Sequence, residues 1–377
     1  MINAQLAQEL AKRHDVTVLT SQGQGLQRES VEHGVRVVRV PVLFRRSEAA
    51  ANLLSMLMFL PMGMWHGRKL MASMPFDVIN THFVLPTGPV GDALARFSGR
   101  PNVLSLHGGD LYDPSKAMSP HRHAVLRTWV RYLLRRATIL VGQSSNTIGN
   151  MNRYYTATLN ARCIPLGIQR PKVEPGNRAE FGISDDAVVL VTVGRLVARK
   201  GLSQLIALMG RLRKSNVKLL ILGSGPMEQT WKNEAKDSGI AANVLFLGQV
   251  SDRDKFKILG MSDLYVSTSQ HEGFGLVFLE AMACGLPVVC YNHGGQTDFL
   301  SDGVTGYLVE LNDIHRFEER CEILIREKAK RQMMGQENLR RVEDYFIDRC
   351  AQRYEELFQQ AINQSSAGPP DGFSRQP

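Results

Sequence analysis

The 377-residue sequence predicts an α/β protein made of two Rossmann-like, doubly wound domains. Three observations predict it. Short β-branched runs bounded by glycine or polar residues recur along the chain, helical patterns alternate with them, and a segment with three prolines, residues 163–178, separates two such series. This alternation is typical of parallel sheets built from βαβ units, and the proline-rich segment is typical of a linker.

The first series has strand-like runs at residues 15–20, 35–40, 77–82, 102–107 and 138–142, with helical patterns such as 121–136 between them. One more helical pattern, roughly Asn3–Arg13, precedes the first of these runs. A doubly wound domain normally opens with a strand and a glycine-rich turn before this helix. We therefore expect the opening strand and its turn to be missing.

The second series has strand-like runs at residues 188–194, 217–223, 244–248, 264–269 and 286–290. We expect an N-terminal domain at residues 1–167 and a C-terminal domain at 168–345. A helix is expected at 346–364. The tail at 365–377 has the composition of a disordered segment.

The net charge of +9 lies in the first part of the chain, where residues 1–165 carry 19 basic and 9 acidic side chains. No basic tract with interleaved aromatic residues is present, so nucleic acid is not an expected partner. An anionic membrane surface or a phosphate-bearing substrate fits better. The five cysteines form no CxxC pair, which favours reduced thiols in a cytoplasmic protein and no zinc site.

The longest apolar run, Leu53–Trp65, is about 13 residues long and contains Pro61. It is too short to span a bilayer, and no signal peptide is visible. Two interpretations stay open. The run is a buried helix of the domain core, or it lies on a membrane surface, where it would be flanked by Arg45, Arg46, Arg68 and Lys69.

Polar and glycine-rich clusters follow four of the expected strands. Ligands of open α/β sheets bind outside the carboxyl ends of the strands, so four such clusters predict one shared site in a cleft between the domains. The clusters are Gly194-Arg195 with Lys200-Gly201, Gly223-Ser224-Gly225-Pro226, His271-Glu272-Gly273-Phe274-Gly275, and His107-Gly108-Gly109-Asp110.

Each cluster has a functional and a structural interpretation. Arg195 and Lys200 lie before a helix, where two cations suit a diphosphate, although a solvated turn would look the same. His107 is expected to be functional, and His82, at another strand end, less so. Asp110 either caps a helix or touches substrate.

Two further patterns predict less than they suggest. Gly223-x-Gly225 lacks the third glycine of a dinucleotide-binding turn. Asp252-x-Asp254 has the form of a metal-binding pair, but it follows Ser251 at a predicted helix start, where capping explains it.

Residues 271–290 carry the most information. Glu280 lies in a helix that is otherwise apolar on every face, and a buried carboxylate is costly unless something binds it. Gly273 and Gly275 allow main-chain N–H groups to approach a ligand closely. Glu280 could accept hydroxyl donors such as a ribose diol, and Glu272 could bind another hydroxylated group. A structural ion pair is the alternative for Glu280.

With these residues the chain resembles a retaining glycosyltransferase of family 4 (GT4), which has the GT-B fold of two Rossmann-like domains facing across a cleft. The resemblance covers nearly the whole chain. It rests on Glu272-x7-Glu280, Gly194-Arg195 with Lys200-Gly201, the 223–226 turn, the sequence AMACGLPVV, Gly294-Gly295, and Asp302-Gly303-x-x-Gly306.

The resemblance implies transfer of a hexosyl unit from a UDP- or GDP-sugar to a glycan or lipid-linked acceptor, as in polysaccharide or lipopolysaccharide synthesis. It implies retention of anomeric configuration, no metal and no cofactor. The expected location is the cytoplasm, with possible peripheral contact at the inner face of the plasma membrane. It also implies that the last helix, about residues 340–362, crosses back to the N-terminal domain.

The implied catalytic residues are His107, near the anomeric centre, Glu272, and the diphosphate-binding pair Arg195 and Lys200. Glu272 and the main chain of 274–276 would hold the sugar, and Glu280 the ribose. The full implied donor-binding set is Gly194, Arg195, Lys200, Gly223, Gly225, Val250, Glu272, Gly273, Phe274, Gly275, Leu276, Val277 and Glu280.

The start of the chain departs from the family pattern, since family members open with a strand and a Gly-Gly loop. We expect a truncated sequence or a start assigned late, and neighbouring strands with unpaired backbone groups. Two other functions stay open. One is a catalytically impaired sugar-nucleotide-binding protein, and the other is a GT-B epimerase or hydrolase, against which the Glu-x7-Glu block argues.

Overall fold

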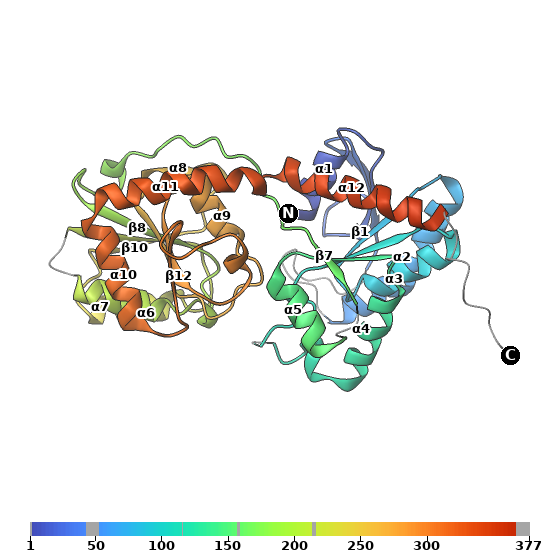
Figure 1. The fold of residues 1–377 in the computed structure, drawn as a ribbon, viewed down its shortest axis with the longest axis horizontal. Coiled ribbons are helices and arrows are strands. Elements are labelled where there is room, and N and C mark those ends of the chain that lie inside the picture. The colour runs from blue at the N-terminus through green and yellow to red at the C-terminus, as the bar shows by residue number, and fades with distance from the viewer. Residues whose placement is uncertain (1, 43–52, 115, 157–158, 213–215, 367–377) are drawn as a thin grey trace. The chain divides into compact units, whose positions relative to one another are not determined.

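The computed structural model describes residues 2–42, 53–114, 116–156, 159–212 and 216–366. The chain divides into two compact units. Unit 1 comprises residues 1–167 together with 347–377, and unit 2 comprises residues 168–346. The last helix, α12 (Ile347–Ser366), belongs to unit 1 and is the long red helix of Figure 1. It begins later than residue 340, because α11 (Lys328–Val342) and a short 3-10 turn occupy the preceding residues.

Unit 2 contains one six-stranded sheet in which every pair of neighbours is parallel. The strand order is β10-β9-β8-β11-β12-β13. Order reverses beside β8, which is where doubly wound sheets place their ligands. The strands are β8 (Val188–Val193), β9 (Val217–Leu222), β10 (Val244–Gly248), β11 (Leu264–Ser267), β12 (Val288–Tyr291) and β13 (Gly306–Val309).

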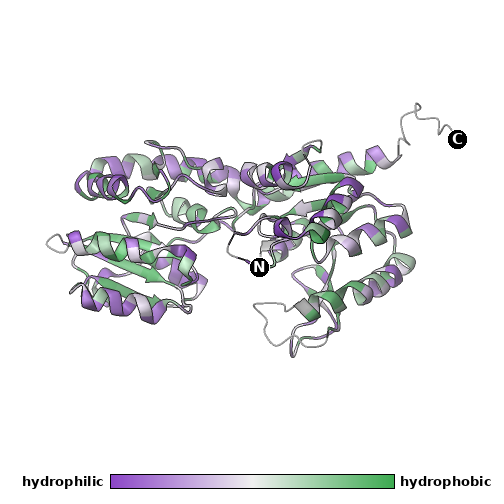
Figure 2. Ribbon diagram, turned by 90° about the horizontal axis from the view of Figure 1, so that it is seen from below, coloured by the Kyte–Doolittle hydropathy of each residue, from purple (hydrophilic) through white to green (hydrophobic). Residues whose placement is uncertain are grey.

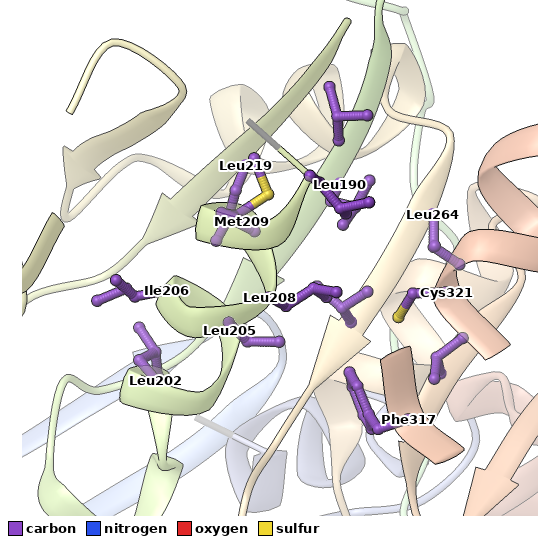
Figure 3. Packing of buried hydrophobic residues seen from close by; sticks show 14 of the residues in the cluster. Leu190, Leu202, Leu205, Ile206, Leu208, Met209, Leu219, Leu264, Phe317 and Cys321 are labelled. Atoms are coloured by element: carbon purple, nitrogen blue, oxygen red, sulfur yellow. The ribbon is translucent and has the colours of Figure 1, made fainter. Parts of the chain in front are cut away.

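Helices enclose this sheet and complete its core. Leu205 and Met209 of one helix meet Leu190 and Leu219 of the strands, with Phe317 from another helix, and all five are at most 1% exposed (Figure 3). Each such side chain contributes roughly 1.5–3 kcal/mol by burial. The helices are α6 (Leu202–Arg211), α7 (Glu228–Asp237), α8 (Asp252–Met261), α9 (Leu276–Ala283), α10 (Ile314–Arg326) and α11.

The strands of unit 1 form two separate sheets. One has the order β1-β3-β2 and the other β4-β5-β6-β7. All pairs are parallel except β2 with β3, which a turn at His33 and Gly34 joins as a hairpin. The strands are β1 (Thr17–Ser21), β2 (Glu29–Glu32), β3 (Val35–Val40), β4 (Ile79–His82), β5 (Asn102–Leu106), β6 (Ile139–Gly142) and β7 (Ala161–Cys163).

The helices of the described chain carry both hydrophilic and hydrophobic residues, as the hydropathy colouring of Figure 2 shows. In α2, Phe59 is buried, whereas Leu57 and Trp65 are 51% and 59% exposed, so the helix both joins the core and presents apolar side chains outside. Among the described residues, no helix is long and apolar enough to cross a membrane. The helices are α1 (Ile2–Leu10), α2 (Leu53–Ser73), α3 (Gly88–Ser98), α4 (Ala124–Arg136), α5 (Ser145–Tyr154) and α12.

Two expectations about chain segments are limited or corrected by the structure. The predicted tail begins too early, because α12 continues through Ser366, and residues 367–377 lie outside the described residues. Arg45 and Arg46, which flank the apolar run, also lie outside them. The helix that contains Pro61 extends to Ser73, well beyond the predicted apolar run.

Candidate functional site

The loops that follow β8 and β9 in unit 2 pack main chain against main chain. A Cβ atom on Gly223 would lie 2.0 Å from the carbonyl oxygen of Gly194, and one on Gly225 would lie 2.3 Å from that of Leu196. The Leu196 N–H donates to the Ser224 carbonyl at 2.9 Å. Loop packing therefore requires both glycines, and it holds the two loops together at the carboxyl edge of the sheet.

Lys200 and Glu272 form a close ion pair between the loop after β8 and the loop after β11. Their side chains are 11% and 10% exposed. The Lys200 ammonium also lies over Gly194, since a Cβ there would be 3.1 Å from Nζ. Arg199 donates to the His271 carbonyl at 2.6 Å and lies 3.9 Å from Glu272. The structure thus brings together two predicted residues, Lys200 and Glu272, and adds Arg199.

The loop of residues 271–275 leads directly into α9 and leaves the start of that helix without a side-chain cap. Gly275 has φ +88° and is the N-cap residue. Leu276 and Val277 follow as half-buried first-turn residues. Uncapped first-turn N–H groups carry the positive end of the helix dipole, which suits an anion.

A second glycine loop, at Gly294 and Gly295, packs against the loop that carries Glu272. The Gly295 N–H donates to the Glu272 carbonyl at 3.1 Å. Cβ atoms on Gly294 and Gly295 would lie 2.5 Å from the Glu272 carbonyl and 2.2 Å from the Gly273 carbonyl. Phe274 is 3% exposed and packs on another ring. The loop that carries Glu272 is therefore fixed by contacts on several sides.

Glu280 makes an ion pair with Lys255 of α8, at 2.7 Å between Oε1 and Nζ, and the side chains are 17% and 14% exposed. Burial raises the pKa of Glu280, while the Lys255 charge opposes the rise. Burial acts to lower the pKa of Lys255, but the charges of Glu280 and Asp252 outweigh it, and the net shift is upward. The structural ion pair left open from the sequence is therefore present, with a partner that the sequence did not indicate.

The Asp252-x-Asp254 pair is a helix start, as the sequence predicts. Ser251 caps α8 by accepting the Asp254 N–H at 3.1 Å, and Asp252 bonds to Lys255 at 3.0 Å. In the described parts of the chain, no group of three or more His, Cys, Asp or Glu side chains is arranged to hold a metal ion. Val250 lies half-buried just before this cap, and Arg195 is exposed at the end of β8.

A second cluster, in unit 1, joins the ends of β4 and β5. His82 Nδ1 lies 3.0 Å from His107 Nε2, and the Asn80 amide nitrogen lies 3.1 Å from His82 Nε2. Because an amide NH2 group only donates, His82 accepts from Asn80 and donates to His107. Burial lowers the pKa of His82 to about 4 and, with the His82 charge, that of His107 to about 3. Both rings are therefore neutral at pH 7.

Asp110 holds the loops around this histidine pair. Its carboxylate accepts the N–H of Val84 at 2.7 Å and that of His107 at 3.0 Å. Burial raises its pKa to about 6, against the effect of these bonds. Asp110 therefore bridges two loops and caps no helix. Phe83, with φ +72°, stacks on His107 with ring centroids 4.1 Å apart.

Two family profiles match the chain, one for each unit. The family described as "Glycosyl transferases group 1" matches residues 173–341. The family described as "Glycosyl transferase 4-like domain" matches residues 2–167. Together these matches cover the candidate site in unit 2 and the histidine cluster in unit 1.

Curated relatives agree with the profiles. The chain is 31% identical over 316 residues to an uncharacterized glycosyltransferase of Methanocaldococcus jannaschii, covering 81% of this chain and 79% of the relative. It is 26% identical over 324 residues to a GDP-mannose-dependent alpha-(1-6)-phosphatidylinositol monomannoside mannosyltransferase of Mycolicibacterium smegmatis, covering 81% and 80%.

Solved structures share the fold. Sucrose-phosphate synthase from Thermosynechococcus elongatus superposes with a TM-score of 0.80 at 22% identity, covering 96% of this chain and 92% of that one. Anabaena HepE in complex with UDP and glucose superposes with a TM-score of 0.73 at 19% identity, covering 95% of each chain. The chain therefore belongs to the family 4 glycosyltransferases, has the GT-B fold, and is a glycosyltransferase of the kind that uses nucleotide-sugar donors.

Proposed function

We propose that the chain transfers a hexosyl unit from a UDP- or GDP-sugar to a glycan or lipid-linked acceptor, with retention of anomeric configuration and without a metal ion. The observation that carries the proposal is the carboxyl edge of the unit 2 sheet. There Lys200 comes from the loop after β8, and Glu272 comes from the loop after β11 that leads into the uncapped start of α9. The mycobacterial relative is GDP-mannose-dependent and HepE is in complex with UDP, which supports this class of donor.

The donor diphosphate is assigned to Lys200, Arg195 and the first turn of α9. Lys200 has three N–H donors, so it can keep its bond to Glu272 and still bind a phosphate oxygen. As the sugar–phosphate bond breaks, negative charge grows on the leaving group. Positive groups fixed in place beforehand stabilise that charge, and removing one such donor typically costs about 10²–10³ in kcat.

Glu280 is assigned to the ribose. Lys255 bonds to Oε1 of the carboxylate, and we assign Oε2 to a ribose hydroxyl. The ammonium favours the ionised form of this buried carboxylate, and an ionised carboxylate is an acceptor only. Lys255 is therefore a positioning residue, and its ion pair prepares Glu280 for a hydroxyl donor.

His107 acts in this proposal as a neutral hydrogen-bond donor to the transferred sugar. Its Nε2 faces His82, so the proton of the neutral ring is on Nδ1. A pKa of about 3 excludes His107 as a general acid at neutral pH. The proton of the acceptor hydroxyl then passes to an oxygen of the departing diphosphate, on the same face of the sugar, which retains the anomeric configuration.

A lipid-linked acceptor is favoured by the charge and surface of unit 1. The excess positive charge lies in the first 165 residues, and α2 exposes Leu57 and Trp65 near Arg68 and Lys69. Basic and apolar groups together favour an anionic membrane surface at the cytoplasmic face. Co-sedimentation with vesicles tests this, and we expect binding to vesicles with anionic lipid that falls with salt. Equal binding to neutral vesicles would contradict the electrostatic part.

The donor assignment is tested by thermal shift with a panel of UDP- and GDP-sugars, followed by nucleotide release with and without candidate acceptors. We expect one donor class to raise the melting midpoint, and release to depend on acceptor. Lys200→Ala is expected to lose about 10²–10³ of the rate. The matched control is Lys232→Ala, which removes an ion pair with Glu228 and a contact over the Phe246 ring, and it is expected to leave the rate unchanged.

Three results would count against the proposal. A chain stabilised by no sugar nucleotide would contradict the donor site. A Lys200→Ala variant as active as the wild type would contradict the diphosphate assignment. Release that does not increase with any acceptor would favour a hydrolase, and product analysis by NMR would show inversion or retention at the anomeric carbon.

A further inference from the structure

Four polar side chains lie on one face of the β4-β5 pair in unit 1, and a fifth reaches them from α12. His82 lies opposite Ser105 in the parallel register of the two strands. Side chains two residues apart on a strand point to the same face, so Asn80 accompanies His82, and His107 accompanies Ser105. The Tyr354 hydroxyl of α12 lies 2.9 Å from the Ser105 hydroxyl on this face. The five polar groups therefore come together in one place within unit 1.

Consecutive contacts join these five side chains in a row. The Ser105 hydroxyl lies 3.3 Å from Asn80 Oδ1, and Asn80 Nδ2 lies 3.1 Å from His82 Nε2. His82 Nδ1 then lies 3.0 Å from His107 Nε2. Ser105 is 2% exposed and Tyr354 is 3% exposed, so the end of the row that is farthest from His107 is buried.

Tyr354 determines the direction of the first hydrogen bond. Burial raises the pKa of its hydroxyl, which therefore keeps its proton at neutral pH. In the part of the chain that the structure describes, the Ser105 hydroxyl is the only hydrogen-bonding partner of this group. A buried donor without an acceptor is costly. Tyr354 therefore donates to Ser105, and the Ser105 proton remains for the next bond.

The direction of each later bond follows from the chemistry of the groups. Ser105 donates to Asn80 Oδ1, because a carbonyl oxygen only accepts. Asn80 Nδ2 only donates, so His82 accepts at Nε2. A neutral imidazole has one N–H, so His82 carries its proton on Nδ1 and donates to His107 Nε2. The last N–H of the row is therefore on Nδ1 of His107.

The opposite direction is costly at one end of the row. It requires the Asn80 amide group to be rotated by half a turn, with its oxygen toward His82, and it places the His107 proton on Nε2. The Tyr354 hydroxyl would then accept from Ser105 and leave its own proton without an acceptor among the described residues. A row that changes direction in the middle would set two donors or two acceptors against each other. Tyr354 thus selects one of two proton arrangements.

We propose that these contacts form one hydrogen-bonded chain with a fixed direction, which starts at Tyr354 Oη–H and ends at His107 Nδ1–H. Asn80, Ser105 and Tyr354 are positioning residues, because they act through His107 and hold its proton on Nδ1. The tautomer follows from the hydrogen bonds alone, whereas the use of Nδ1–H on the transferred sugar rests on the proposed function.

Asn80→Asp reverses the chain and tests its direction. Carboxylate oxygens only accept, so a neutral His82 must carry its proton on Nε2, and its Nδ1 must then accept from His107 Nε2–H. The experiment uses the full chain with 15N-labelled histidine, and two-bond 1H–15N correlation spectra report which ring nitrogen carries a proton. Spectra from about pH 7 to about pH 9.5 follow His82 to a pH where it is neutral beside the new carboxylate. His107→Gln assigns the His107 signals.

We expect the wild-type chain to carry the His107 proton on Nδ1, and Asn80→Asp to carry it on Nε2 once His82 is neutral. A proton on Nε2 in the wild type would overturn the direction of the chain. A proton that stays on Nδ1 in Asn80→Asp, beside a neutral His82, would overturn the control of His107 by Asn80.

Tyr354→Phe tests the start of the chain. It removes the hydroxyl and keeps the ring, so the Ser105 hydroxyl can then donate or accept in either direction. We expect the ratio of Nδ1–H to Nε2–H on His107 to fall at least about fivefold. Thr81→Val is the matched control, because it removes a buried bond to Asn102 on the opposite face of the same strands, and it should leave the ratio unchanged. An unchanged ratio in Tyr354→Phe, or equal changes in both variants, would overturn the role of Tyr354.

Nucleotide release separates the proton position from the proposed function. Release of UDP from UDP-glucose and of GDP from GDP-mannose is measured with water as the acceptor. We expect Asn80→Asp to lower the faster of the two rates at least about tenfold at the pH where the tautomer is reversed, and Thr81→Val to leave it unchanged. A reversed tautomer with an unchanged rate would overturn the positioning role. A wild type that releases neither nucleotide counts against the proposed function, and the spectra still decide the direction of the chain.

Discussion

The two units have the same alternation of strands and helices. Only in unit 2, however, do the described strands form one continuous sheet. In unit 2, six strands form one continuous sheet, and inner-strand residues such as Leu190 and Leu264 are 0% exposed. In unit 1 the described strands form sheets of three and four, and β1, at the edge of its sheet, is only half-buried at all five residues. The difference shows that burial of a strand depends on its neighbours, as well as on an apolar sequence.

The two clusters at the strand ends also differ in how they hold buried polar groups. The cluster in unit 2 uses ion pairs, Lys200 with Glu272 and Lys255 with Glu280. The cluster in unit 1 uses a pair of neutral histidines and the bridging Asp110. Ion pairs beside a helix start suit a charged diphosphate, whereas neutral rings suit uncharged hydroxyl groups. This division is consistent with a donor site in unit 2 and sugar or acceptor contacts in unit 1.

The largest expected effect is on the free energy of unfolding, after a large-to-small substitution in the core of unit 2. Leu205→Ala in unit 2 should lower the free energy of unfolding by about 3–5 kcal/mol, because it opens a cavity in a filled interior. The same change at Leu10, which lines a cavity of about 1140 Å³ in unit 1, should cost about 2 kcal/mol or less, because part of that side chain already lacks contacts. Urea unfolding of the two variants measures the difference. Equal losses would contradict the contrast between the units.

The next largest effect is on donor affinity, and it concerns the loops that follow β8 and β9 at the carboxyl edge of the unit 2 sheet. Gly223 has φ +128°, and an added Cβ would clash with the Gly194 carbonyl, so Gly223→Ala must displace one loop. We expect donor affinity to fall about tenfold or more. Gly210→Ala is the control, since its Cβ meets open space within α6, and it should leave donor affinity unchanged. Isothermal titration calorimetry checks both, and unchanged binding by Gly223→Ala would show that the loops tolerate separation.

The smallest effect is a difference in pH dependence. The folded pKa values of His82 and His107, about 4 and 3, lie below the usual 6.5, so their stabilisation is present above about pH 6.5 and is lost as the pH falls. Asp110, with a pKa raised to about 6, contributes to stability in the opposite direction as the pH falls. This single carboxyl group opposes two histidines. Glu280 in unit 2 also has a raised pKa and opposes loss of stability in acid.

We therefore expect unit 1 to lose stability between pH 7 and pH 5 more steeply than unit 2. A variant with both His82→Asn and His107→Asn should show a weaker dependence of unit 1 stability on pH, whatever the absolute stability of the variant. Hydrogen exchange at several pH values, corrected for the intrinsic rate, measures each unit separately. A slope in unit 1 that survives the double substitution would contradict the role of the histidine pair.

Much of the fold could be predicted from the sequence because its inner strands are apolar and short. The predicted runs at β3, β9 and β10 agree with the structure to within a residue. β2 was missed, because its sequence Glu-Ser-Val-Glu is mostly exposed and its pairing comes from a hairpin turn. β7 and β13, of three and four residues, were missed as well.

The site could be predicted only in part, for a physical reason. Lys200 and Glu272 follow strand ends of the unit 2 sheet, and His107 follows a strand end in unit 1. Parallel strands bring their carboxyl ends to one edge within each sheet, so sequence position alone locates these residues on their own sheets. Lys255, Arg199 and Asn80 were missed because they act through contacts between elements that no local pattern encodes. The Gly223 and Gly225 positions were predicted, but their requirement for loop packing emerged only from the structure.

The central claim is that the carboxyl edge of the unit 2 sheet binds the donor, and hydrogen exchange with and without a saturating sugar nucleotide tests it most directly. We predict slower exchange in residues 194–201, 223–225 and 272–280, with no change at the opposite edge of the sheet, such as residues 216–218. Bound donor, demonstrated by calorimetry, with unchanged exchange in all three segments would contradict the claim.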